Sequence, residues 1–236
     1  MNIEVKTPLT LAVDIGGSNV KMLVLDADGQ PVTERTKRET PRPAIPEAVL
    51  SAVIDQIPEH GRFDRVSVGF PGVVIAGVVM TAANLHEDWH NFELAKVLSE
   101  QTAVPVRVAN DADIQGYGVV EGNGVELVIT LGTGFGSALF TDDVLVPNLE
   151  LGHHIFKDSK TYEELLGQAG RKAIGNQEWS QLLIEALTQL DALFNPNVIY
   201  VGGGNAKKIK LPLPEHATIT HNIAGILGGI KLWNES

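Results

Sequence analysis

The sequence predicts an α/β protein with two lobes, and three observations support that prediction. Short apolar runs bounded by turn residues alternate with segments whose apolar residues recur at helical spacing. A strand–glycine turn–strand unit occurs twice, as LAVDIGGSNVKMLVL (residues 11–25) and LVITLGTGFGSALF (residues 127–140). Gly16 corresponds to Gly132, an offset of 132 − 16 = 116 residues, which indicates an internal duplication. A chain of 236 residues can form one large domain or two smaller ones, and the duplication favours two.

Composition excludes several classes of protein. The net charge of −11 argues against non-specific nucleic-acid binding. The chain has no cysteine, so disulfides, thiolate zinc sites and cysteine nucleophiles are excluded. We see no charged-then-apolar leader and no apolar run long enough to span a membrane. We therefore expect a soluble, cytoplasmic protein.

In the first half of the chain we expect a hairpin over 11–32, followed by a third strand before a proline-rich connector. Pro46 suits the first turn of a helix over 46–57. A strand over 66–70 ends at a Pro-Gly turn, and Gly77 sits within a further hairpin. Asn91 could cap a helix over 92–101.

In the second half, a strand over 104–108 leads through Asn110 and Asp111 into a helix over 112–120. After the second glycine hairpin, Thr161 and Glu164 form a capping box for a helix over 162–174. The remaining expected elements are a helix over 177–194 capped by Asn176, strands over 198–201 and 217–220, and a helix over 223–233.

The glycine turns are candidates for phosphate binding. Gly16 and Gly17 can take positive φ and let backbone N–H groups approach an anion, while Asp14 could hold a metal-bound water. A plain hairpin turn explains one such copy equally well. Two copies could clamp a polyphosphate chain from both sides. The run 202–204 could be a helix-entry turn against a flat base or ribose, or a flexible connection, and Lys207, Lys208 and Lys210 after it could be a solvated face or a phosphate contact.

Asp111 is the first candidate for catalysis, because ligands of open α/β sheets gather where a strand gives way to a helix. It could equally cap that helix, although Asn110 could do so instead. Glu150, His153, Glu163 and Asn84 form a looser polar group in or beside loops, where they could be ordinary surface residues or could bind the hydroxyls of a sugar.

These motifs resemble those of the ROK family of bacterial sugar kinases, within the superfamily of sugar kinases, actin and heat-shock chaperone ATPases. Within the family they are most similar to the polyphosphate glucokinase subfamily. The resemblance covers nearly the whole chain and rests on residues 14–18, 68–74, 81–85, 110–112, 131–136, 146–153, 195–196 and 201–204. It implies two RNase H-like lobes with a glucose site in a central cleft. The first lobe is expected at 1–109 with a C-terminal helix over 222–236, and the second at 110–221.

The resemblance also implies roles for individual residues. Asp111 is the expected catalytic base for the sugar 6-hydroxyl, and Asp14 the expected contact of Mg²⁺ through water. The sugar-binding residues are expected to be Asn84, Asn110, Glu150, His153 and Glu163. Phosphate binding is expected at Asp14, Gly16, Gly17, Ser18, Asn19, Lys21, Gly132, Thr133 and Gly134, and nucleotide binding at Gly202, Gly203 and Gly204.

Some alternatives remain open at this stage. The resemblance favours polyphosphate as phosphoryl donor, whereas the acidic balance and the run 202–204 favour ATP. The acceptor could be another hexose, and a non-catalytic sugar sensor related to the family's repressors is a further alternative. Those repressors carry an additional DNA-binding domain, and only ten residues precede the first strand here, so we expect no DNA-binding role. Because cysteine is absent where many members have a zinc motif, we expect no structural zinc; a homodimer is possible by analogy.

Overall fold

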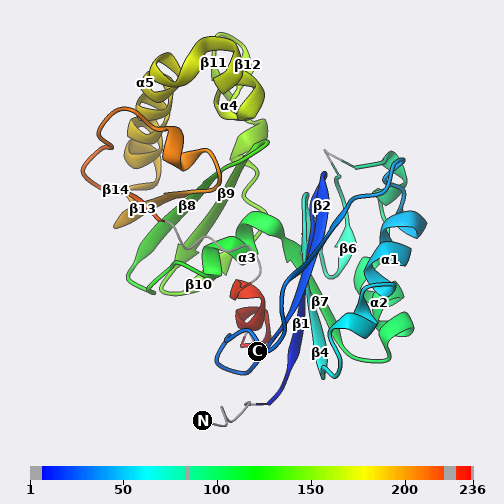
Figure 1. The fold of residues 1–236 in the computed structure, drawn as a ribbon. Coiled ribbons are helices and arrows are strands. Elements are labelled where there is room, and N and C mark those ends of the chain that lie inside the picture. The colour runs from blue at the N-terminus through cyan, green and yellow to red at the C-terminus, as the bar shows by residue number, and fades with distance from the viewer. Residues whose placement is uncertain (1–6, 83–84, 221–226, 235–236) are drawn as a thin grey trace. The chain divides into compact units, whose positions relative to one another are not determined.

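The chain forms two compact units, residues 1–117 with 224–236 and residues 118–223. The computed structural model describes residues 7–82, 85–220 and 227–234. Each unit is built on its own five-stranded sheet (Figure 1). Within the described ranges, no helix is both long and apolar enough to cross a bilayer.

The first unit contains a mixed sheet of order β3-β2-β1-β4-β7, in which β1 pairs antiparallel with β2 and parallel with β4, and β4 pairs parallel with β7. Its strands are β1 (Thr10–Ile15), β2 (Asn19–Leu25), β3 (Thr36–Glu39), β4 (Arg65–Phe70) and β7 (Val106–Asn110), with the small hairpin β5 (Val74–Ile75) and β6 (Val78–Val79). Its helices are α1 (Pro46–Ile54), α2 (Leu94–Thr102) and α3 (Asp111–Tyr117), with 3-10 turns η1 (Ile57–Glu59), η2 (Glu87–Trp89) and η5 (Leu227–Trp233).

Alternation along the strands of this sheet gives its two faces different partners. Leu11 and Val13 of β1 belong to the main core, which also contains apolar residues of α1 and α2. Ala12 faces the other way and packs with Leu23, Leu25 and Ile230. That second face also carries α3, since a Cβ on Gly69 would lie 3.5 Å from Ile114 Cδ1 and 3.6 Å from Asp111 Cα. The sheet therefore has one face covered by α1 and α2 and one covered by α3 and η5.

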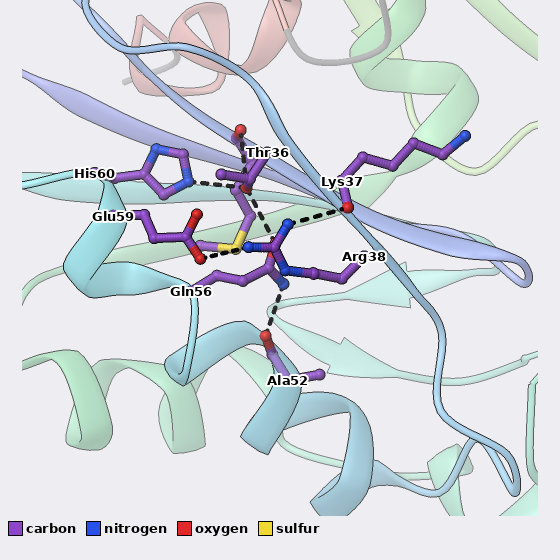
Figure 2. A network of polar contacts seen from close by, with 8 residues as sticks. Thr36, Lys37, Arg38, Ala52, Gln56, Glu59 and His60 are labelled. Carbon is purple, nitrogen blue, oxygen red and sulfur yellow. Dashed lines mark hydrogen bonds and ion pairs between the residues drawn. The ribbon is translucent and has the colours of Figure 1, made fainter.

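A buried polar network fastens the edge strand β3 to the segment after α1 (Figure 2). His60 is 3% exposed, and its Nε2 lies 3.0 Å from Thr36 Oγ1 while its Nδ1 lies 3.1 Å from Thr33 Oγ1. Gln56 Nε2 donates to the Ala52 carbonyl, so its Oε1 accepts from the Thr36 hydroxyl. That hydroxyl must then accept from His60, which assigns a proton to Nε2 of the imidazole.

The second unit repeats this topology, with a sheet of order β10-β9-β8-β13-β14. Its apolar core unites Leu127 and Ile129 of β8 with Trp179 and Leu183 of α5. The strands are β8 (Val125–Leu131), β9 (Phe135–Thr141), β10 (Val144–Val146), β13 (Val198–Gly202) and β14 (Ala217–Ile219), with the small pair β11 (Ile155–Lys157) and β12 (Lys160–Thr161). The helices are α4 (Tyr162–Leu166) and α5 (Gln168–Phe194), with 3-10 turns η3 (Leu151–His153) and η4 (Ala206–Lys208).

The duplication expected from the sequence is present, but its two turns differ in length. In both sheets the first three strands are antiparallel and the next two are added in parallel. Ile15 pairs with Val20, whereas Leu131 pairs with Phe135, so the second turn is one residue shorter. The constant offset of the sequence comparison therefore holds up to the turn and changes after it.

Helix ends differ from the expectations more than strands do. Asn91 does not cap α2, because it adopts φ 60° and the helix begins at Leu94 with Glu93 before it. The helix expected over 162–174 is divided, since α4 ends at Leu166. The next helical segment, α5, is interrupted at Gly175, which has non-helical φ 82° and ψ 165°, so the expected break between residues 174 and 177 is confirmed. The Thr161–Glu164 capping box is confirmed. Of the helix expected over 222–236, residues 222–226 and 235–236 lie outside the described part, and 227–233 form a 3-10 helix.

The division between the units follows the packing of α3. The sequence analysis set the boundary after residue 109, which assigned Asn110 and Asp111 to the second lobe. In the structure both residues belong to the first unit, because α3 packs on β4, β7 and η5.

Candidate functional site

In the first unit, candidate residues lie where three parallel strands end. Asp14 of β1 lies beside Gly69 of β4, which lies beside Ala109 of β7. The chain beyond these positions supplies the first glycine turn after β1 and Asp111 after β7. The carboxyl ends of adjacent parallel strands are where open α/β sheets place ligands. The turn and Asp111 thus belong to one edge of one sheet.

Asp14 is 8% exposed and forms an ion pair with Lys21, whose Nζ lies 2.6 Å from Asp14 Oδ2. The pair follows from register, because Asp14 and Lys21 are directly opposite in the β1–β2 hairpin. Two residues expected to bind phosphate or metal are thus in contact with each other. The ion pair is made through Oδ2, one of the two oxygens of the Asp14 carboxylate.

The glycines of the first turn serve close approach rather than positive φ. Neither Gly16 nor Gly17 is among the glycines with positive φ, which corrects the use we expected of them. The Gly16 N–H donates to the Asn19 carbonyl at 2.9 Å, and a Cβ on Gly16 would lie 3.1 Å from that oxygen. Ser18, in the same turn, is held by the next segment of the chain, because its carbonyl accepts a hydrogen bond from the Thr40 N–H at 3.0 Å.

The connector after β3 braces this turn, a role the sequence analysis missed. Thr40 Oγ1 donates to the Gly16 carbonyl at 2.6 Å, and Arg42 Nη2 donates to the Gly17 carbonyl. Thr40 is 5% exposed. The signal available in the sequence was a threonine and an arginine among prolines, which we interpreted only as a connector.

Asn110 provides the cap of α3. Its Oδ1 accepts from the Ala112 N–H at 2.7 Å, and its Nδ2 donates to the Gly72 carbonyl at 3.2 Å. This bears on one open alternative, since Asn110 makes a capping bond at the start of α3. Asp111 is the first residue of the helix and is half-buried. Sugar binding by Asn110 stays a prediction.

In the second unit, Glu150, His153 and Glu163 come together as a cluster. His153 Nε2 lies 3.4 Å from Glu150 Oε2. Burial raises the pKa of Glu150, the nearby Glu163 raises it further, and His153 opposes both effects. Glu150 directly precedes η3, His153 ends it, and Glu163 lies ten residues after His153 in the first turn of α4. The cluster offers two carboxylates and an imidazole to the hydroxyls of a polar ligand.

Glu163 also lies directly against the second glycine turn. The Phe135 N–H donates to Glu163 Oε2 at 3.3 Å, and a Cβ on Gly134 would lie 2.2 Å from that oxygen. A Cβ on Gly132 would meet nothing within 4 Å. Thr133 is held through its carbonyl, which accepts from the Gln168 N–H at 3.0 Å. One glycine of this turn makes room for a carboxylate, whereas the other faces open space.

The triple glycine after β13 is a tight connection into η4. Gly203 has φ 86°, and a Cβ there would lie 2.5 Å from the Leu131 carbonyl oxygen. Gly202 ends the strand beside Thr130, and Gly204 faces open space. Asn205, which the sequence analysis did not single out, donates from Nδ2 to the Gly132 carbonyl at 2.7 Å. This bond ties the turn after β13 to the turn after β8.

Two predictions concern residues or ions that the structure leaves untested. Asn84 lies outside the described residues. Among the residues that are described, no group of three or more His, Asp or Glu side chains could hold a metal ion.

Comparison with known proteins identifies relatives along the whole chain. The ROK family model matches residues 10–173. The polyphosphate glucokinase of Mycobacterium leprae (strain TN) is 33% identical over 233 residues, covering 92% of this chain and 72% of that protein. The polyphosphate glucokinase of Mycobacterium tuberculosis (strain ATCC 25618 / H37Rv) is 32% identical over 232 residues, covering 92% and 88%.

Solved structures agree with that result. The inorganic polyphosphate/ATP-glucomannokinase from Arthrobacter sp. strain KM superposes with a TM-score of 0.87 and 34% identity, over 96% of this chain and 98% of that one. A ROK family glucokinase from Streptomyces griseus in complex with glucose and AMPPNP gives a TM-score of 0.80 at 21% identity, over 95% and 98%, which shows the shared fold. The fold is the sugar kinase and actin type, and the chain belongs to the ROK family.

Proposed function

We propose that this protein is a glucokinase that transfers a phosphoryl group to the 6-hydroxyl of glucose, with inorganic polyphosphate or ATP as donor. The observation that carries the proposal is the similarity to polyphosphate glucokinases at 32–33% identity over 92% of the chain. A cytoplasmic location and a homodimer stay predictions.

Asp111 is the base in this proposal. It follows the end of β7, at the same edge of the sheet as the first glycine turn, and Asn110 makes a capping bond to α3. A carboxylate there can accept the proton of the sugar hydroxyl as the oxygen attacks the terminal phosphorus atom of the donor. The remaining contribution to phosphoryl transfer is positioning and charge neutralisation.

Sugar recognition is assigned to the Glu150, His153 and Glu163 cluster. Carboxylates accept hydrogen bonds from hydroxyls, and a site built for hydroxyls strongly rejects analogues that lack them. Burial of Glu150 strengthens any bond it accepts, because the local dielectric constant is low. Asn84 and Asn110 stay predicted members of this group.

The glycine turns are assigned to the phosphates of the donor. Gly16, Gly17, Gly132 and Gly134 lack side chains that would obstruct an anion, and backbone N–H groups are suitable donors to phosphate. Asp14 fits a magnesium site in one respect, since Mg²⁺ commonly takes one or two carboxylates together with substrate phosphates. When bound, the ion would neutralise charge on those phosphates. Gly202, Gly203 and Gly204 are assigned to a nucleotide if ATP is used.

A coupled assay tests the function. The purified protein is supplied with glucose, Mg²⁺ and either long-chain polyphosphate or ATP, and glucose 6-phosphate is measured. Asp111→Asn is expected to lower kcat by roughly 10²- to 10⁴-fold, the usual contribution of a general base. If no glucose 6-phosphate forms with either donor, the proposal is contradicted and a sugar sensor is favoured. Near-normal turnover by D111N would remove Asp111 from its role.

Mannose is a second candidate acceptor. The observation that favours it is the 34% identity to a structure described as a glucomannokinase, which covers 96% of this chain. Running the same assay with mannose in place of glucose gives the ratio of kcat/KM values. A ratio near one would establish an enzyme for both hexoses.

A further inference from the structure

The edge of the first sheet carries two lysines directly opposite each other. Lys21 of β2 pairs in register with Lys37 of β3. Residues opposite each other on antiparallel strands point to the same face, and like charges in that position repel. Lys21 is neutralised by Asp14 at 2.6 Å. Within the described part of the chain, no carboxylate pairs with Lys37, whose side chain is exposed.

Register places these lysines on the face that carries Asp111. Lys37, Lys21, Asp14, Gly69 and Ala109 form one row across the five strands. The backbone and Cβ of Asp111 lie over Gly69 on that face. Figure 2 shows the Lys37 side chain running away from His60 and Gln56, which lie on the opposite face.

The row also indicates how far the charges extend. Adjacent strands are about 4.8 Å apart, so the backbone of Lys37 lies roughly 10 Å from that of Asp14. A single phosphoryl group is much shorter than this distance. A chain of linked phosphates can reach from the first glycine turn to the outer strand. The basic residues Arg35, Lys37, Arg38 and Arg42 are gathered in and around β3, in a chain whose net charge is −11.

We propose that Lys37, together with Lys21, binds the phosphates of inorganic polyphosphate that lie beyond the group being transferred. The inference rests on the proposed function, since it assumes that the donor is bound at the first glycine turn. The edge strand then provides a track for the polyanion. It also accounts for the lysine pair, because a polyanion gives Lys37 the negative partner that Asp14 gives Lys21.

The same strand offers a matched control. Arg38 is next to Lys37 and also exposed, but it points to the opposite face, where it forms an ion pair with Glu59 at 2.7 Å. Lys37→Ala and Arg38→Ala therefore remove the same charge from adjacent positions on opposite faces. Lys37→Arg keeps the charge on the proposed track.

The test compares steady-state kinetics with long-chain polyphosphate and with ATP. Lys37→Ala is expected to raise KM for long-chain polyphosphate about 3- to 10-fold, the range for loss of a charge-assisted contact, with kcat and KM for glucose unchanged. The slope of log KM against the logarithm of the salt concentration should become less steep, by the contribution of about one released counterion. Lys37→Arg should retain wild-type KM, and Arg38→Ala should behave like wild type.

Glu39 supplies a test of opposite sign. It lies on the same face as Lys37, opposite Asn19, and would repel the polyanion. Glu39→Gln is expected to lower KM for long-chain polyphosphate about 2- to 5-fold, the size of a surface charge interaction. Thermal unfolding of each variant without donor checks that the fold is intact.

The outcomes separate the inference from the proposed function. Equal polyphosphate KM values for Lys37→Ala, Arg38→Ala and wild type would overturn the track, while glucose kinase activity would still stand. Use of ATP with no use of polyphosphate would overturn it as well. An equal rise in KM for ATP and for long chains would also overturn it, because the contact would then lie within the first three phosphates.

Discussion

Gly134 offers a perturbation whose effect can be worked out from the structure. A Cβ at this position would lie 2.2 Å from Glu163 Oε2, where an ordinary contact is about 3.4 Å, so the carboxylate must move by about 1 Å. Gly134 is not among the glycines with positive φ, so alanine is accommodated by its backbone. The obstructing atom is the end of a flexible side chain, so the cost to folding is the Phe135–Glu163 hydrogen bond, about 1 kcal/mol.

The functional cost should be larger than the folding cost. Misplacing a positioning group by about 1 Å can lower turnover about 100-fold. We therefore expect Gly134→Ala to lower kcat/KM for glucose by about 10- to 100-fold while Tm falls by only a few degrees. Steady-state kinetics with glucose varied at saturating donor, together with the glucose-induced shift in Tm, measure this effect.

Gly132→Ala is the matched control in the same turn. An added Cβ there meets nothing within 4 Å, so Glu163 is left in place. If the turn receives phosphate, this variant should raise KM for the donor and leave KM for glucose near its wild-type value. Wild-type glucose kinetics in Gly134→Ala would refute the assignment of Glu163 to the sugar. Identical kinetic defects in both variants would refute the assignment of Gly132 to the donor and of Gly134, through Glu163, to the sugar.

Two further predictions depend on titratable groups. Burial raises the pKa of Glu150 in the folded state, so its ionisation destabilises the fold progressively as pH rises from 4.5 through the folded pKa. Glu150→Gln should therefore raise Tm at pH 7 while raising KM for glucose about 10- to 100-fold, and a lower Tm would contradict this reasoning. Burial lowers the pKa of His60, so its neutral form stabilises the fold above pH 6.5 and this contribution is lost as pH falls from 6.5 through the folded pKa. His60→Gln should therefore lose less stability than wild type between pH 7.5 and pH 5.5 in denaturant titrations, and an equal loss would exclude His60 as the cause.

The strands could be predicted closely because their signal is local. Apolar runs bounded by glycine mark both duplicated hairpins, and the structure places their ends within two residues of residues 11–25 and 127–140. Helix ends were less predictable, since Asn91 has a side chain suited to capping but a left-handed backbone fixed by the preceding loop. A propensity describes one residue, whereas its backbone angle here depends on where two neighbouring elements must meet.

The site shows what a sequence can and cannot predict about geometry. The Thr161–Glu164 capping box fixes where α4 begins, so the sequence did place Glu163 in its first turn. It could not show that Glu163 lies against Gly134, because that contact depends on how α4 packs on the second hairpin. Thr40 and Asn205 were missed for the same reason, since each acts on a turn that is distant along the chain.

The two copies of the hairpin have diverged toward different chemistry. Opposite partners Asp14 and Lys21 in the first copy correspond to Thr130 and Gly136 in the second, so only the first copy carries a charged pair beside its turn. The second copy has a shorter turn and takes its charge from Glu163. Duplication thus supplied two backbone turns of similar form, and later substitutions made them unequal. Under the proposed function, the first turn has the Lys21 cation beside the donor's phosphates, whereas the second leaves Gly132 open to phosphate and sets the Glu163 carboxylate at Gly134 as an acceptor for the sugar.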